Sequence, residues 1–292
     1  MDETVDLLHR CTFPEPKTTV TCALSGGADS TALVFLAIAA ECTVDAVHVH
    51  HGLRPSADHD AECARRTAET LGVPFRCIQV DLEDGPNLEA RARDARRSVL
   101  GLHALTGHTA DDQAETLLLA LLRGSGATGL AAITPGPRHP ILALRTAETR
   151  ALCRREGLTF ATDPTNIDPR FRRNRVRHEL IPLLNAIADR DVTPLLTRTA
   201  GLLRNDDDLL ESLSSTLDPT DATALNNAPD ALAARSVRRW LTRDGYPPGA
   251  AAVQRVLAVA AGDSTACEVP GGLRIERHRG RLRILPDEQS TR

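Results

Sequence analysis

A loop rich in glycine and serine follows a short β-type stretch near the N-terminus. The stretch covers residues 19–24, and the loop reads Ser25-Gly26-Gly27-Ala28-Asp29-Ser30. Two glycines let a backbone approach a ligand closely, and the N–H groups of such a loop and of the helical turn behind it favour an anion such as pyrophosphate. The serine hydroxyls add donors, and the Asp29 carboxylate suits Mg²⁺ or the orientation of the loop itself. The segment therefore predicts a phosphate-binding site that requires no lysine.

A plain turn is the alternative for this loop, with Ser30 as the N-cap of the next helix. We favour the phosphate site, because the loop follows the carboxyl end of a predicted strand, where open α/β sheets bind ligands. A P-loop nucleotide site is excluded, because the only lysine, Lys17, lies outside any Gly-Lys-Ser/Thr sequence.

Three carboxylates and a histidine are grouped between residues 108 and 115. On a helix, Asp112 and Glu115 share a face because they are three residues apart, and Asp111 lies four residues before Glu115. With His108 nearby, such a group suits a cation, either a metal or a substrate ammonium. The alternative is that one aspartate caps the helix and Glu115 is solvated. Three carboxylates and a histidine after a predicted strand favour a functional cluster.

Two further groups could contact ligands. His50 and His51 end the second predicted strand beside the loop, where they could border an adenosine or be a plain polar strand end. Residues 168–180 hold five arginines against two acids, and the last predicted hairpin holds five against one, local charges of +3 and +4. Such patches match contact with nucleic-acid phosphates or a solvated face. Arg91 and Arg93 could clamp phosphate or cover a helix surface.

The elements that would position these residues alternate between strands and helices. Apolar strand patterns at 19–24, 44–50, 75–80, 104–106 and 141–144 alternate with helical patterns at 30–40, 57–71, 87–103, 111–123 and 147–156. This alternation predicts an α/β fold with a doubly wound, mainly parallel sheet. We place the catalytic domain at 1–187. A smaller helical domain at 188–292 follows, with helices at 192–217, 229–243 and 250–260 and a hairpin at 273–277 and 281–285.

Composition limits the class of protein. The 292 residues carry a net charge of −4, which excludes a globally basic nucleic-acid coat. Seven cysteines form no C-x-x-C pair, which predicts reduced thiols in a cytoplasmic protein. The longest apolar run, 32–40, is far too short to span a membrane. The sequence indicates no particular oligomeric state.

The loop SGGADS resembles the pyrophosphate-binding loop of the N-type ATP pyrophosphatases, which split ATP into AMP and pyrophosphate. Further stretches resemble the tRNA(Ile)-lysidine synthetase family within that superfamily, in family order. They are HVHHGLR (48–54), EARAR (89–93), GHTADDQAET (107–116), RG (123–124), DPTN (163–166) and RNRVRHELIPLL (173–184).

This resemblance implies a PP-loop, Rossmann-like fold and a two-step ligation. ATP, with Mg²⁺, adenylates C2 of the wobble cytidine at position 34 of the CAU-anticodon isoleucine tRNA. The ε-amine of free L-lysine then displaces AMP and leaves lysidine, which changes codon reading from AUG to AUA and identity from Met to Ile.

The resemblance also implies roles for individual residues. Residues 25–30 and His50 would bind ATP, with Asp29 and Asp111 as magnesium ligands. Asp112 and Glu115 would hold the lysine amine, and His108 would assist the chemistry. The expected tRNA contacts are Arg173, Asn174, Arg175 and Arg177.

Two alternatives stay open at this point. A tRNA thiolase of the same superfamily would generally need paired cysteines, and an inactive RNA-binding adaptor would not need an intact loop and acidic cluster. Longer family members carry an additional C-terminal domain for tRNA, for which residues up to Arg292 leave no room. We therefore expect the helical part and the hairpin to dock the tRNA.

Overall fold

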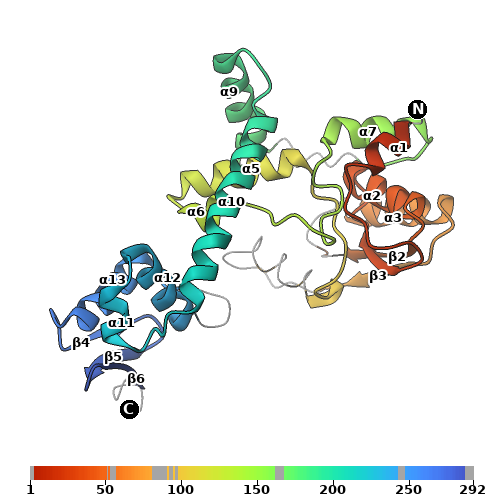
Figure 1. The fold of residues 1–292 in the computed structure, drawn as a ribbon. Helices are drawn as coiled ribbons and strands as arrows, with labels where there is room; N and C mark the ends of the chain where they lie inside the picture. The colour runs from red at the N-terminus through yellow and green to blue at the C-terminus, as the bar shows by residue number, and fades with distance from the viewer. Residues whose placement is uncertain are drawn as a thin grey trace. The chain divides into compact units, whose positions relative to one another are not determined.

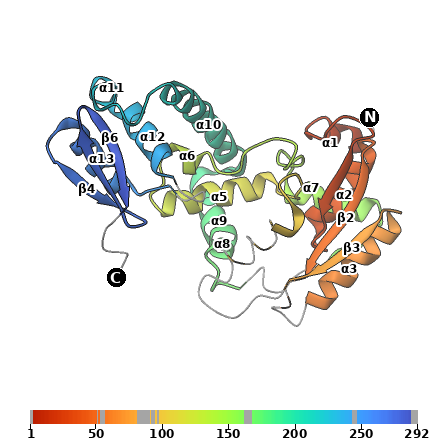
Figure 2. The ribbon, with the colours of Figure 1, turned by 90° about the horizontal axis from the view of Figure 1, so that it is seen from below.

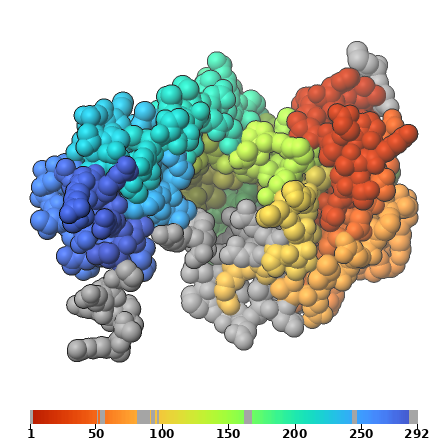
Figure 3. Space-filling model, turned by 60° about the horizontal axis from the view of Figure 1, so that its bottom comes forward, coloured from red at the N-terminus to blue at the C-terminus, as the bar shows by residue number. Residues whose placement is uncertain are grey.

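The computed structural model describes residues 3–50, 52, 57–80, 91, 95, 98–161, 168–242 and 247–286, which are the coloured residues in Figure 3. Contacts divide the chain into two units, Met1–Leu202 and Leu203–Arg292. Several predictions lie outside the described residues: His51, Arg93, most of the helix at 87–103 and the segment at 163–166.

A parallel sheet is the centre of the first unit. Its strands are β1 (Thr19–Ala23), β2 (Thr43–His50) and β3 (Phe75–Gln79), in the order β1-β2-β3. Figure 1 labels β2 and β3 of this sheet. Leu105 extends this sheet beside β1, because its N–H donates to the Thr21 carbonyl at 2.8 Å and its carbonyl accepts from Ala23 N–H at 2.9 Å. The predicted parallel α/β architecture is confirmed.

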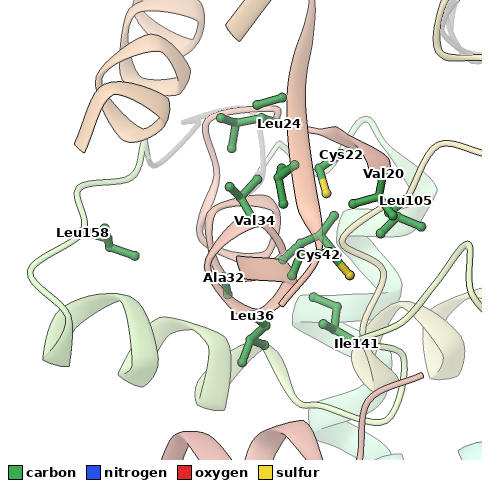
Figure 4. Close-up of a cluster of buried hydrophobic side chains, with 14 of the residues drawn as sticks. Val20, Cys22, Leu24, Ala32, Val34, Leu36, Cys42, Leu105, Ile141 and Leu158 are labelled. Atoms are coloured by element: carbon green, nitrogen blue, oxygen red, sulfur yellow. The ribbon is translucent and has the colours of Figure 1, made fainter. Parts of the chain in front are cut away.

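Helix α2 (Ala28–Ala39) is the most buried element of this unit. Its sequence is apolar on nearly every face, and Leu33, Val34 and Leu36 have no exposed surface. It packs between the sheet and α7 (Thr146–Arg155), while α3 (Ala57–Thr70) packs on β2 and β3 and α1 (Glu3–Leu8) contacts α2 (Figure 2). Figure 4 shows the resulting core, in which Val34 and Leu36 lie with side chains from the sheet. Burial on all sides fixes the start of α2, which is where the glycine loop ends.

A second core fixes the elements that follow the sheet. The helices α5 (Ala110–Leu122), α6 (Ala127–Leu130), α8 (Arg172–Arg175) and α9 (Ile181–Ala188) come before α10 (Thr193–Ser215), and a π-helix runs from Val176 to Leu180. Leu117 and Leu118 of α5 pack against Val176 and against Ala200 of α10. Because α9 and the start of α10 belong to this core, the division between the units falls after Leu202. The predicted boundary after residue 187 lies inside α9.

The apolar residues 141–144 are turns, so the strand predicted there is wrong. Leu142 N–H donates to His139 and Leu144 N–H to Ile141, each closing a tight turn. Ile141 and Leu144 are nonetheless fully buried. A short apolar run reports burial and does not by itself distinguish a strand from buried turns.

The second unit is helical and ends in an antiparallel sheet. Its helices are α11 (Ala222–Asn227), α12 (Asp230–Leu241) and α13 (Ala250–Ala261). The strands β4 (Ala266–Val269), β5 (Leu273–His278) and β6 (Arg281–Pro286) pair in the order β4-β5-β6. Ile275 and Leu282 bury the apolar face of the predicted hairpin against the helices. Across the described residues of both units, no helix combines the length and hydrophobicity needed to span a membrane.

Candidate functional site

The glycine loop is closed on itself by its two serines. The Ser30 hydroxyl accepts a hydrogen bond from Ser25 N–H at 3.1 Å and donates to the Gly27 carbonyl at 2.9 Å, and the two serine Oγ atoms are 3.0 Å apart. Helix α2 begins at Ala28, two residues earlier than predicted. Asp29 and Ser30 therefore lie in its first turn, and the loop proper is only three residues long.

Backbone amides of this loop are available to a ligand. Among the described residues, the N–H groups of Gly26, Gly27, Ala28 and Asp29 have no hydrogen-bond partner. Gly26 has φ of 91°, and a Cβ there would lie 2.6 Å from the Asp60 carbonyl oxygen. Only glycine fits, and the turn it makes leads the chain into the N-terminus of α2. Free amides together with the positive end of a helix favour an anion, so the predicted phosphate site stays a prediction that this geometry suits.

The side chain of Asp29 is held by α7. Its carboxylate accepts hydrogen bonds from the Thr149 hydroxyl and, at 3.3 Å, from the Thr146 hydroxyl. Burial raises the pKa of Asp29 to about 6; the threonine hydroxyls and Arg177 oppose this shift, whereas Asp112 adds to it. Asp29 is thus an ionisable group that titrates near neutral pH beside the anion site.

Gly107 brings the acidic cluster to the loop. A Cβ at this position would lie 2.8 Å from the Asp29 carbonyl oxygen and 2.9 Å from the Ser30 nitrogen. The backbone of residue 107 therefore lies directly on the first turn of α2, and the next residue is His108. Sequence analysis had not singled out this glycine, because its role depends on a contact between distant segments.

The cluster itself is built on the first two turns of α5. Thr109 is the N-cap, and its N–H donates to Asp112 at 2.8 Å. Asp112 accepts from Arg173 Nη2 at 2.7 Å. Burial raises the pKa of Asp112, but Arg173, His108, the Thr109 amide and Arg177 together lower it below its usual value. Asp112 is therefore an ionised carboxylate.

Glu115 is a carboxylate with no exposed surface. Its oxygens accept from Arg173 Nε at 2.6 Å and from Arg177 Nε at 2.5 Å. The two arginines are four residues apart on the turns formed by α8 and the π-helix, so they face the same carboxylate. Two acids and two guanidinium groups thus balance each other's charge beside the anion loop.

The four predicted tRNA contacts lie in different surroundings. Arg173 and Arg177 point into the acidic cluster. Asn174 is buried and donates to the Asp168 carbonyl at 2.9 Å. Arg175 is exposed and pairs with Glu179 at 2.9 Å. Of these residues, the one on the surface is Arg175.

Asp111 does not fit the predicted role of a magnesium ligand. Its carboxylate accepts from Arg145 Nη2 at 2.9 Å and from Thr146 N–H at 2.7 Å, so a guanidinium group already neutralises its charge, whereas the side chains that hold Asp29 are neutral hydroxyls. Arg145 also pairs with Asp191, just before α10. Asp111 and Arg145 instead tie α5, α7 and the start of α10 together. Within the described part of the chain, no three His, Cys, Asp or Glu side chains are grouped to hold a metal.

His108 has two neighbours that hold its ring. Its Nδ1 lies 2.8 Å from the Thr106 hydroxyl and 3.2 Å from Nδ1 of His139. Sequence analysis missed His139, because it stands in a loop sequence with no chemical spacing to the other candidates. His50 ends β2, and its Nε2 is 3.0 Å from Asp58, beside a cavity of about 350 Å³ lined also by Glu62, Arg65 and Cys77. Its contact with ATP stays a prediction.

Comparisons with known proteins show which families the two parts of the chain resemble. The family model of the PP-loop domain matches residues 3–184, and that of the TilS substrate binding domain matches residues 221–283. The tRNA(Ile)-lysidine synthase of Nocardia farcinica is 44% identical over 249 residues, 80% of this chain and 78% of that protein. The one from Rhodococcus erythropolis is 42% identical over 79% of this chain and 76% of its own.

Similarity to a solved structure at low sequence identity supports the fold of this chain and says nothing of its activity. The U34-tRNA thiolase NcsA from Methanococcus maripaludis aligns with a TM-score of 0.56 and 16% identity, over 69% of this chain and 78% of that chain. That protein is described with a [4Fe-4S] cluster.

The contact at Gly107 predicts that Gly107→Ala weakens ATP binding by about tenfold or more, since the added methyl group must push the first turn of α2 away. Gly126→Ala is the matched control, because a Cβ there meets nothing within 4 Å. Calorimetric titration with ATP measures both. Equal affinity of the two variants would contradict the placement of Gly107.

The burial of Glu115 predicts unequal effects of two neighbouring arginines. Arg173→Ala leaves a buried carboxylate short of a partner and lowers the free energy of unfolding by about 3 kcal/mol. Arg175→Ala removes an exposed pair and costs less than about 1 kcal/mol. Urea unfolding followed by circular dichroism compares them, and similar losses would show that Glu115 is solvated.

The raised pKa of Asp29 predicts that the free energy of unfolding depends on pH. Its folded pKa of about 6 lies above the ordinary value, so the folded state binds the extra proton and loses stability as pH rises from about 4 to 6. Asp29→Asn removes this dependence, so its gain in melting temperature over the wild type is larger at pH 7.5 than at pH 4. A gain that is independent of pH would contradict the raised pKa.

Proposed function

The chain belongs to the tRNA(Ile)-lysidine synthase family, and we propose that it joins free L-lysine to C2 of the wobble cytidine of the CAU-anticodon isoleucine tRNA. In the first step the C2 oxygen attacks the α-phosphorus of ATP, and pyrophosphate leaves. In the second step the lysine ε-amine attacks C2, the C–O bond breaks and AMP leaves. The amine loses its protons and the product is lysidine.

One observation carries this proposal. The anion loop and the acidic cluster meet at the first turn of α2, through the contact of Gly107 with the backbone of Asp29 and Ser30. The C2 oxygen of the cytidine joins the two reacting centres, because it first bonds to the α-phosphorus as pyrophosphate leaves and then departs from C2 with AMP as the amine attacks. The pyrophosphate site and the amine site must therefore lie close together. The two parts of this site are adjacent and differ in charge, as such a reaction requires.

The loop residues bind the leaving group. The free amides of residues 26–29 and the N-terminus of α2 stabilise charge as it develops on pyrophosphate. Mg²⁺ bound together with ATP would neutralise part of the phosphate charge. Asp29 is the described residue whose carboxylate fits such an ion, because it lies in the first turn of α2 and the ion would keep it ionised.

The charge-balanced cluster matches a free amino acid. Lysine carries ammonium groups and a carboxylate, and the cluster offers carboxylates from α5 and guanidinium groups from the turns after residue 171. Asp112 has 15% of its side chain exposed, whereas Glu115 has none. Asp112 is therefore the carboxylate that an ammonium reaches, and Glu115 acts on the substrate only through Arg173 and Arg177, which it holds in place.

An ammonium has no lone pair, so the ε-amine must lose a proton before it attacks. Asp112 binds the ammonium form, and its lowered pKa keeps it a poor proton acceptor. His108 lies close enough to Asp112 to shift its pKa and is the imidazole nearest this carboxylate in sequence. We assign proton removal to His108.

The tRNA contacts would come from both units. The target cytidine lies in a single-stranded loop, where a base can turn out of the stack into a pocket. Arg175 is exposed next to the cluster. In the hairpin, Arg281 pairs with Asp218 and Arg277 donates to the Ala260 carbonyl, which leaves Arg274, Arg279 and Arg283 exposed for phosphates. A tRNA substrate places the reaction in the cytoplasm.

The cysteines argue against a thiolase. All seven are free, and burial raises the pKa of Cys11, Cys22 and Cys153 to about 12. A thiolate is the form that carries sulfur or binds a metal. The raised pKa values therefore disfavour sulfur transfer by these residues.

Purified protein with Mg-ATP and labelled lysine is expected to modify a tRNA transcript with a CAU anticodon and not one with UAU. Incorporation into both transcripts, or into neither while ATP still binds, would contradict the proposal. AMP and pyrophosphate should appear in equal amounts with the CAU transcript alone.

Asp112→Asn keeps the cap on Thr109 but removes the negative charge. We expect it to lower lysine incorporation by at least about 100-fold while ATP affinity changes little. Asp206→Asn, at an exposed position of α10, is the matched control and should leave incorporation unchanged. Full activity of Asp112→Asn would show that lysine binds elsewhere.

A further inference from the structure

We propose that Thr106 and His139 position the imidazole of His108 and that the two histidines share one proton. Nothing in the family resemblance assigns either residue a role. The inference rests on the proposed function in that His108 is the group that removes the lysine proton. It adds two positioning residues to that site.

A closed triangle of polar atoms carries the proposal. The Thr106 hydroxyl oxygen lies 2.8 Å from Nδ1 of His108 and 2.7 Å from Nδ1 of His139, and the two nitrogens are 3.2 Å apart. The rings meet edge to face, with centroids 4.9 Å apart and planes at 80°. Both imidazoles thus direct the same nitrogen at one hydroxyl.

The three residues are held by the backbone on each side. Thr106 N–H donates to the Arg138 carbonyl at 2.9 Å, which joins the two segments. His139 N–H donates to Gly136 at 2.9 Å, and the Pro140 carbonyl accepts from Thr12 N–H at 2.9 Å. On the other side of Thr106, Leu105 is paired with β1 and Gly107 lies on α2. The triangle is therefore part of the rigid sheet edge and not a chance contact of loops.

The donors and acceptors available limit how many protons this triangle can hold. The Thr106 hydroxyl also lies 3.3 Å from the Arg138 carbonyl, which competes for its proton. A hydroxyl donates one proton, so it cannot donate to both rings, and two Nδ1–H groups facing each other at 3.2 Å would repel. Two doubly protonated rings would place like charges at the same distance. One Nδ1 proton shared with the hydroxyl satisfies all three atoms, and the pair titrates as a unit.

Charged groups around the triangle act in both directions. Asp112 of α5 favours a charged His108, and this carboxylate is itself compensated by Arg173 and Arg177. The backbone of Asp29 contacts Gly107, the residue before His108, and Arg138 directly precedes His139 in the sequence. His139 is the group that opposes a second positive charge. A positive charge on His139 would oppose a second one on His108, which favours the neutral imidazole that a proton acceptor must be.

The test uses His139→Gln and Thr106→Val in the full chain, with Thr106→Ser as the conservative variant. His103→Gln, at an exposed position, is the matched control. Long-range ¹H–¹⁵N spectra follow the titration of each histidine, with His108 assigned from His108→Asn. Lysine incorporation into the CAU transcript is measured against pH, with separate kcat and KM values for lysine and ATP. Circular dichroism confirms that each variant is folded.

We expect His139→Gln to raise the titration midpoint of His108 and to move the acidic limb of the kcat profile upward in parallel. Thr106→Val should lower kcat by about 10- to 100-fold with both KM values within about twofold, and Thr106→Ser should restore it. The His103→Gln variant should match the wild type. An unchanged His108 titration in His139→Gln would overturn the proposal, as would equal kcat losses for Thr106→Val and Thr106→Ser.

The spectra separate this inference from the proposed function. If the wild-type chain makes no lysidine, the proposed function fails, and the titration of His108 in His139→Gln still decides whether the two rings share a proton.

Discussion

The site depends on a carboxylate that has no contact with water. Glu115 lies on the face of α5 that packs against the turns after residue 171, and a charge buried there requires partners. Arg173 and Arg177 supply them, and the π-helix that begins at Val176 carries one of the two. The same pairing brings Arg173 to Asp112, so the partner of the buried Glu115 also stabilises the charge of the partly exposed Asp112. The requirement to neutralise Glu115 thus organises the proposed amino-acid site.

Two contacts connect this proposed site to the glycine loop. Gly107 lies against the Asp29–Ser30 peptide in the first turn of α2, and Asp111 and Arg145 link α5 to α7, whose threonines hold Asp29. The loop, the acidic cluster and His108 are therefore fixed relative to one another before any ligand arrives. Preorganisation of this kind lowers the reorganisation that a two-step ligation needs at each step.

Much of the fold was predictable, because strands and helices of the first unit follow local patterns of burial. The position of the glycine loop between β1 and α2 was also predictable, since its glycines and serines mark a turn locally, while its binding of phosphate stays a prediction. The prediction of a strand at 141–144 was wrong, because an apolar run indicates burial and not the backbone conformation. The direction of Arg173 and Arg177 was not predictable, because a basic run does not reveal that a buried carboxylate from another helix faces it. The roles of Asp111 and His139 were not predictable for the same reason. They come from contacts with Arg145 and Thr106, which no spacing in the sequence indicates.

The central claim is that two carboxylates and two guanidinium groups together recognise both charged ends of a free lysine. Calorimetric titration of the protein with L-lysine and with lysinamide, in the presence of a non-hydrolysable ATP analogue, tests it most directly. Lysinamide keeps the ammonium groups but lacks the carboxylate that Arg173 and Arg177 would contact. The account predicts that lysinamide binds about 10- to 100-fold more weakly than lysine, the loss of a charged hydrogen-bonded contact. Equal affinities would contradict it.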